Sequence, residues 1–138
     1  TENKKRYFYE NEILSQSSLN LNKNKFNKNY NFKNKYKVKC INLDTYYKGI
    51  NGKFIIDILK IDAEGEDLNV LKGCKQLLYK KKIKIIKIEL LNSIRNNKSN
   101  ILEIINFLSS YNYFINTIVK SKFENNRLLM MDTYFISK

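Results

Sequence analysis

The alternation of apolar and polar residues along the chain predicts a protein built from both strands and helices. Residues 54–61 and 83–90 are two nearly continuous apolar runs, which are typical of strands covered on both faces of a sheet. Between them, apolar residues recur every three to four positions over residues 66–80 and predict a helix. This order predicts a right-handed βαβ unit with parallel strands.

The flanking segments extend this pattern. Asp44 is expected to cap a short helical turn, and residues 120–126 are expected to form a long hairpin loop. The remaining predicted elements are strands over residues 5–14, 36–42, 111–119 and 128–136, and a helix over residues 101–110 capped by Asn100. Together they predict an open α/β sheet with parallel strands and a C-terminal antiparallel hairpin.

Residues 20–35 are rich in asparagine and lysine and have neither a helical nor a strand period. They are interpreted as a solvated loop or an insertion within the domain. The alternative is a nucleic-acid arm, in which lysines meet phosphates and aromatic side chains stack on bases.

The composition of the chain indicates its net charge and excludes several kinds of catalytic and metal-binding site. The chain of 138 residues has 26 basic and 13 acidic residues, a net charge of +13. Such a surface attracts phosphate-bearing partners, although the excess of Asn, Ile and Tyr beside Lys favours biased codon usage as its cause. With no histidine, two cysteines and four glycines, the chain contains no histidine-based catalytic triad, no four-thiolate zinc site and no GxGxxG or Walker loop. No metal site is expected.

The sequence also supports expectations about the cellular location of the protein and about how much of it the chain represents. No apolar run reaches the roughly 20 residues that a membrane span requires. Cys40 and Cys74 are expected to be reduced thiols in a cytoplasmic protein. Because the chain starts at Thr1 without methionine, a partial polypeptide is expected.

Four carboxylates follow the first apolar run within six residues: Asp62, Glu64, Glu66 and Asp67. Glu66 and Asp67 are interpreted as favouring the positive end of the following helix. Asp62 and Glu64 would stand at the carboxyl end of a strand, where open α/β sheets bind their ligands. The alternative is structural: Asp62 would cap or pair with Lys60, and Gly65 would make the turn. The strand-end position favours the interpretation in which Asp62 and Glu64 project into a cleft.

The residues around this acidic turn resemble the core motif of the FkbM-type methyltransferases. The similarity is carried by Lys60-Ile61-Asp62-Ala63-Glu64-Gly65-Glu66 and by Val70-Leu71-Lys72-Gly73. Weaker matches in the same order as in the family are Ser17-Ser18-Leu19, Leu43-Asp44 and Ile88-Glu89. The resemblance extends from about Ser17 to the end of the chain.

This resemblance implies a partial class I, Rossmann-like methyltransferase sheet that uses S-adenosylmethionine, with residues 54–61 as the fourth strand and 83–90 as the fifth. It implies methyl transfer to a hydroxyl of a small molecule or sugar. In this reading Asp62 and Glu64 are catalytic, and Lys60 and Asp62 contact the cofactor.

The family's glycine-rich first strand-and-turn and its ribose-binding acid have no counterpart here. Residues 1–138 are therefore expected to be the C-terminal portion of the domain and inactive alone. An exposed sheet edge would then invite self-association. The alternative function is a non-catalytic basic α/β module that binds nucleic acid or an acidic partner.

Overall fold

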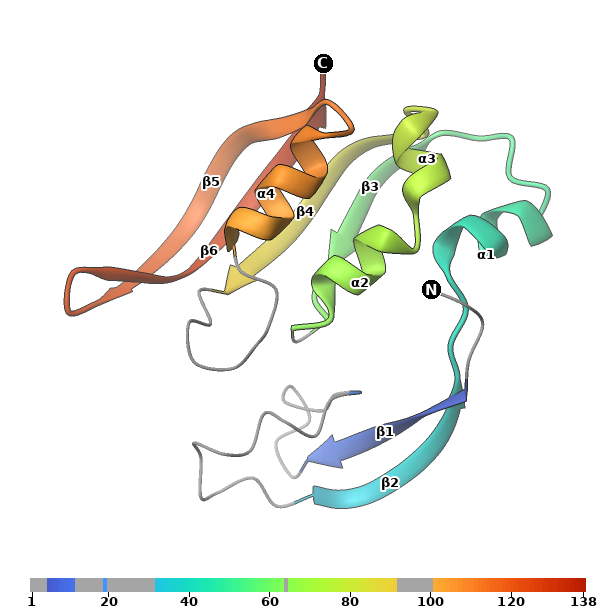
Figure 1. Cartoon of the computed structure of the whole chain (residues 1–138), viewed down its shortest axis with the longest axis horizontal. Helices are drawn as coiled ribbons and strands as arrows, with labels where there is room; N and C mark the ends of the chain where they lie inside the picture. Colours follow the sequence, from blue (N-terminus) through green and yellow to red (C-terminus); the bar gives the residue numbers. More distant parts are fainter. Residues whose placement is uncertain (1–4, 12–18, 20–31, 64, 92–100) are drawn as a thin grey trace.

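A computed structural model of the chain describes residues 5–11, 19, 32–63, 65–91 and 101–138. Figure 1 shows the elements that these residues form. The strands are β1 Lys5–Asn11, β2 Phe32–Lys39, β3 Ile56–Ile61, β4 Ile83–Leu91, β5 Tyr113–Glu124 and β6 Arg127–Ser137. The helices are α1 Leu43–Gly49, α2 Asp67–Lys72, α3 Lys75–Tyr79 and α4 Ile101–Ser109.

The larger sheet contains the strands β3, β4, β6 and β5 in that spatial order. β3 and β4 run parallel, and their register pairs Ile58 with Ile85. β6 runs antiparallel to both β4 and β5. The predicted parallel strands and the predicted C-terminal antiparallel hairpin are therefore confirmed, and the described chain is a mixed α/β protein.

The C-terminal hairpin is tighter than predicted. Glu124 at the end of β5 pairs with Arg127 at the start of β6. Asn125 and Asn126 alone form the turn, with φ angles of 48° and 60°. A turn with two left-handed residues matches the twist of the flanking strands, and asparagine tolerates this conformation well. The expected long loop over residues 120–126 is wrong because its polar residues continue an exposed strand.

The single helix expected over residues 66–80 is also wrong, because it is interrupted between α2 and α3. α2 ends at Lys72 with Gly73 as its C-cap, and α3 begins at Lys75 after the N-cap Cys74. A Cβ atom at Gly73 would lie 3.2 Å from the Cβ atom of Asn42, so the N-terminus of α1 approaches closely at this point. The absence of a side chain at Gly73 therefore allows this close contact with the N-terminus of α1.

α1 also supplies the cap of α3. The Asp44 carboxylate accepts hydrogen bonds from the backbone N–H groups of Gln76 (2.9 Å) and Leu77 (3.0 Å). The cap of α1 itself is Asn42, whose side chain accepts from the backbone N–H of Thr45. The prediction that Asp44 caps its own helical turn is therefore wrong, because its carboxylate satisfies donors that lie far away in the sequence.

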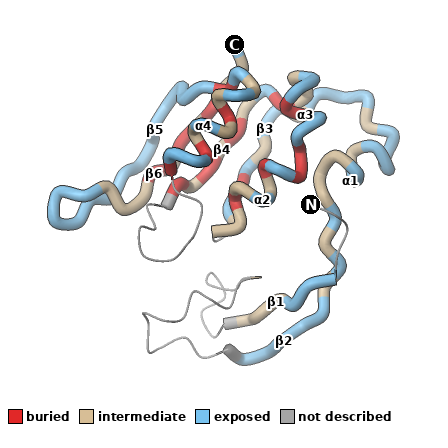
Figure 2. The backbone as a smooth tube through the Cα atoms, viewed as in Figure 1, coloured by how far each residue is buried: buried red, intermediate tan, exposed pale blue. Residues whose placement is uncertain are grey.

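The hydrophobic core lies between one face of the sheet and the layer formed by α2, α3 and α4 (Figures 1 and 2). β4 and β6 occupy the centre of the sheet and contribute side chains to this core, whereas β5 is exposed except at Tyr113. Fully buried core residues include Leu71, Cys74, Leu78, Ile86, Ile88, Leu90, Leu108, Tyr113 and Phe135.

The opposite face of the sheet carries an apolar row that the described helices leave uncovered. Cross-strand register aligns Ile58, Ile85, Ile136 and Phe114, one from each strand. The row is open at both edges, where Ile58 is 56% and Phe114 40% exposed. The expectation that β3 is covered on both faces is therefore wrong for the residues described.

β1 and β2 form a separate antiparallel ribbon. β2 begins at Phe32, earlier than the predicted residue 36, so the last residues of the expected loop 20–35 belong to a strand. Residues 12–14 of the first predicted strand, residues 20–31 of the loop and Asn100 lie outside the described residues. In the part of the chain that is described, no helix has the length and apolarity to cross a membrane.

Candidate active site at the carboxyl end of β3

The acidic turn, residues 62–67, connects β3 to α2. β3 ends at the buried residue Ile61, and Gly65 adopts a φ of 95° that lets the chain reverse direction. The Asp67 carboxylate accepts hydrogen bonds from the backbone N–H groups of Ala63 (2.9 Å) and Gly65 (3.0 Å). Asp67 is only 5% exposed, so these bonds are made largely out of water.

From the sequence, Asp67 is interpreted only as a favourable charge near a helix terminus, but in the structure it also stabilises the turn. Each of its two oxygens accepts a hydrogen bond from one backbone N–H group of the turn. Hydrogen bonds to an ionised acceptor are stronger than neutral ones. The position of Asp62 relative to the sheet consequently depends on Asp67.

Asp62 is placed where the strand-end argument predicts it. Its side chain is 46% exposed, and its Oδ2 atom lies 3.1 Å from the Lys60 Nζ atom. Both residues border a cavity of about 200 Å³ on the open face of the sheet. Glu64 lies outside the described residues. The structure thus brings two of the three predicted site residues together.

Cross-strand register builds the rest of this cavity. In the sheet register, Lys60 of β3 lies opposite Lys87 of β4. Two residues further along β4, Glu89 lies opposite Asp132 of β6, and Asp132 in turn lies opposite Lys120 of β5. The cavity lining is therefore strongly charged and carries both signs. Its residues are Lys60, Ile61, Asp62, Lys87, Glu89, Lys120, Met130 and Asp132.

Sequence reasoning missed Lys87, Lys120, Glu89 and Asp132 as site residues. Alternation within residues 83–90 does place Lys87 and Glu89 on one face of their strand. Nothing local to the sequence reveals that β6 lies between β4 and β5, and this order alone brings Asp132 to the site.

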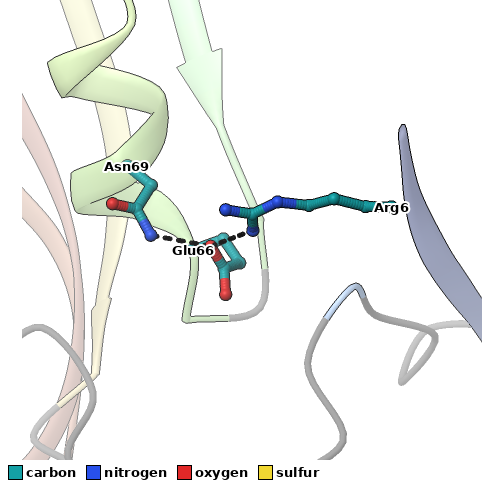
Figure 3. Close-up of polar contacts among 3 residues, drawn as sticks. All are labelled: Arg6, Glu66 and Asn69. Atoms are coloured by element: carbon teal, nitrogen blue, oxygen red, sulfur yellow. Dashed lines mark hydrogen bonds and ion pairs between the residues drawn. The ribbon is translucent and has the colours of Figure 1, made fainter. Parts of the chain in front are cut away.

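A larger cavity of about 780 Å³ lies on the other side of the acidic turn, between the ribbon, α1, β3 and α2. Glu66, at the start of α2, borders this cavity, and Figure 3 shows its polar contacts. Its Oε2 atom accepts a hydrogen bond from Asn69 Nδ2 at 2.8 Å and pairs with Arg6 Nη1 at 3.4 Å. Glu66 therefore links β1 to α2, a role beyond the predicted one at the helix terminus.

The surroundings of Cys74 do not make its thiol a nucleophile at ordinary pH. Both are free thiols, and Cys74 is fully buried. Burial, and secondarily the negative charge of Asp44, raises the pKa of Cys74 to about 12. The thiolate is the reactive form, so Cys74 is a core residue. Among the described residues, no three His, Cys, Asp or Glu side chains gather as a metal site.

The fold and this site define a class of protein: an α/β protein with a charged cavity at the carboxyl ends of its parallel strands, where such folds bind ligands. The family model of the methyltransferase FkbM domain matches residues 2–115, so the chain belongs to this family. Membership implies methyl transfer that depends on S-adenosylmethionine. No curated protein and no solved structure matches the chain.

Proposed function

We propose that this chain forms the C-terminal portion of a methyltransferase that transfers a methyl group from S-adenosylmethionine to a hydroxyl of a small molecule or sugar. Its catalytic carboxylates are Asp62 and Glu64, and Lys60 and Asp62 contact the cofactor. The observation that carries the proposal is the position of Asp62, exposed at the carboxyl end of β3 beside a charged cavity, in a chain of the FkbM family.

The residues present suit the polar parts of the cofactor. A carboxylate attracts a sulfonium cation or accepts a hydrogen bond from a ribose hydroxyl. An ammonium group binds the carboxylate of the cofactor's methionine part. Asp62 and Lys60 would supply these two groups from one end of β3. When bound, the cofactor supplies an electrophilic methyl group.

The acceptor hydroxyl must lose its proton as its oxygen forms the new bond to carbon and the carbon–sulfur bond breaks. Asp62 or Glu64 would accept that proton, and a positioned base typically contributes about 10²- to 10⁴-fold in rate. Lys60, whose Nζ atom lies 3.1 Å from Asp62 Oδ2, would hold this carboxylate in place beside the cavity. The mixed charges around the cavity suit an acceptor with several hydroxyls, which both donate and accept hydrogen bonds.

The open face of the sheet supports the proposed division of the domain. Sheets that contain parallel strands normally have both faces covered by helices. The apolar row from Ile58 to Phe114 lacks such a cover among the described residues. We infer that preceding polypeptide, including a glycine-rich cofactor loop, covers this row next to β3, and that residues 20–35 are an insertion within the domain.

The test compares this chain with the protein extended upstream in its gene, using labelled S-adenosylmethionine. We expect methyl transfer only by the extended protein, and its turnover should fall about 10²-fold or more in Asp62→Asn. Asp57→Asn is the matched control, because Asp57 is an exposed acid at the opposite end of β3 that also pairs with a lysine.

Two results would contradict the proposal in different ways. Micromolar binding of S-adenosylmethionine to the 138-residue chain in calorimetry would contradict the division of the domain. Equal turnover of folded Asp62→Asn and Asp57→Asn proteins would remove the catalytic role of Asp62 and leave the family assignment intact.

A further inference from the structure

The ribbon of β1 and β2 has two chemically different faces. Because side chains alternate along a strand, the register of the ribbon assigns every regular position to a face. Tyr7 is paired with Lys37 and Tyr9 with Lys35, so all four side chains share one face. Lys5 and Lys39, which form a further pair, end the same face. We call these six residues the lysine–tyrosine face.

The lysine–tyrosine face is basic and open to solvent. All four lysines are exposed, and Tyr7 is 47% exposed. The Lys35 Nζ atom lies 3.9 Å from the centre of the Tyr7 ring and 5.7 Å from that of Tyr9, which confirms that these side chains meet. No acidic residue belongs to this face.

The opposite face contains the one acid of the two strands and is turned towards the rest of the molecule. Glu10 accepts hydrogen bonds from Asn34 Nδ2 (2.7 Å) and Tyr36 Oη (2.9 Å). Arg6, also on this face, reaches Glu66 at the start of α2. The Glu10 carboxylate therefore forms its hydrogen bonds on the inner face and does not pair with the lysines of the outer face.

This arrangement of lysines has a local energetic cost. Like charges directly opposite each other on paired strands, as in Lys5 and Lys39, destabilise the pairing. Elsewhere in the structure a strand lysine lies beside an acid, as Lys84 does beside Asp57. A polyanion lying along the ribbon would remove the repulsion.

We propose that the lysine–tyrosine face binds single-stranded nucleic acid. Lysines 35, 37 and 39 follow one strand at intervals of about 6.7 Å and can contact successive parts of a phosphate backbone. Tyr7 supplies an exposed ring on which a base can stack, as in proteins that bind single strands with little sequence preference. The aromatic contribution favours a nucleic acid over other polyanions. This surface is separate from the cavity at Asp62 and does not depend on methyl transfer.

The experiment measures the binding of a short fluorescein-labelled thymidine oligonucleotide to the full chain by fluorescence anisotropy. Neutralising about three or four phosphates of a single strand predicts a slope of roughly −2 to −3 in the logarithm of affinity against that of salt concentration. Lys35→Glu/Lys37→Glu should weaken binding at least tenfold. Its matched control is Lys75→Glu/Lys80→Glu, the same charge change at exposed positions of and just after α3.

A second pair of variants tests the aromatic contact without changing charge. Tyr7→Leu should weaken binding several-fold, whereas Tyr79→Leu, at a 75% exposed tyrosine on α3, should not. Equal losses in the two lysine variants would overturn the proposal. It would also fail if Tyr7→Leu bound like the wild-type chain, or if heparin, anionic vesicles or duplex DNA bound as tightly as the single strand.

Discussion

At the scale of single residues, the buried carboxylate of Asp67 stabilises the turn that carries the proposed site. Asp67 does not border either cavity, yet both of its oxygens bind the backbone of the turn that places Asp62. A change at Asp67 should therefore act on stability and on the geometry of the turn together.

Replacing Asp67 by alanine should lower the free energy of unfolding by about 2–3 kcal/mol, because two partly buried N–H groups lose an ionised acceptor. Asp67→Asn keeps one acceptor oxygen and should lose less. Urea unfolding measures both. Asp57→Ala, at a side chain that is 77% exposed, should cost at most about 0.5 kcal/mol. A loss in Asp67→Ala no larger than in this control would contradict the assigned role.

The buried thiol of Cys74 predicts a pH dependence. Its pKa is raised from 9.0 to about 12 in the folded chain, so above pH 9.0 the unfolded chain ionises while the folded chain stays protonated. The free energy of unfolding is therefore unaffected by this group below pH 9.0 and falls as pH rises towards 12.

Urea titrations of wild type and Cys74→Ala should reveal this dependence. Above about pH 9 the wild-type stability should fall more steeply, by up to roughly 1.4 kcal/mol per pH unit. Tyr113, whose pKa burial also raises, titrates in both proteins, so its effect largely cancels in the difference. Parallel curves for the two proteins would show that Cys74 ionises as readily in the folded chain as in the unfolded one.

At the scale of elements, the interruption between α2 and α3 depends on α1. The Asp44 N–H donates to the carbonyl of Gly73, and the Asp44 carboxylate accepts from the first turn of α3. These contacts direct the second helix over the sheet, where Leu77 and Leu78 are buried. α1 thus determines the path of a segment more than thirty residues later in the sequence.

Asp44→Ala should lower the free energy of unfolding by about 1–2 kcal/mol, the usual effect of removing a helix cap. Helical circular dichroism at low denaturant should fall as the first turn of α3 frays. Asn42→Ala, which removes the cap of α1, provides a comparison at a helix with no buried residues. If Asp44→Ala were neutral, water would be satisfying the α3 donors equally well.

At the scale of the whole molecule, the sheet is packed on one face only among the described residues. Leu71→Ala, in the core under the helices, should cost about 2–5 kcal/mol. Ile58→Ala, on the open face, should cost at most about 0.5 kcal/mol in this chain. In the upstream-extended protein the same Ile58 substitution should cost about 2 kcal/mol or more, because the row is then covered. Chemical denaturation of both proteins measures the difference.

An equal and small effect of Ile58→Ala in the two proteins would mean that preceding polypeptide does not cover the row. A large effect in the 138-residue chain would instead mean that a second copy covers it, which sedimentation would detect as a dimer.

The sequence alone determined those features that depend on local pattern. Apolar runs and helical spacing revealed β3, β4 and the helical segment between them, and the carboxylates after β3 identified Asp62 as a strand-end acid. The family core motif around Lys60 and Asp62 was readable for the same reason, since its residues are contiguous.

Only the tertiary structure decided features that depend on contacts between distant segments. The insertion of β6 between β4 and β5 brought Asp132 to the cavity, the docking of α1 divided the predicted helix, and the packing of the ribbon joined Arg6 to Glu66. The spacing of apolar residues along the chain indicates which side chains will be buried, but many arrangements of the elements are compatible with the same spacing. The choice among them rests on long-range packing and hydrogen bonding, and these placed the side chains of the site.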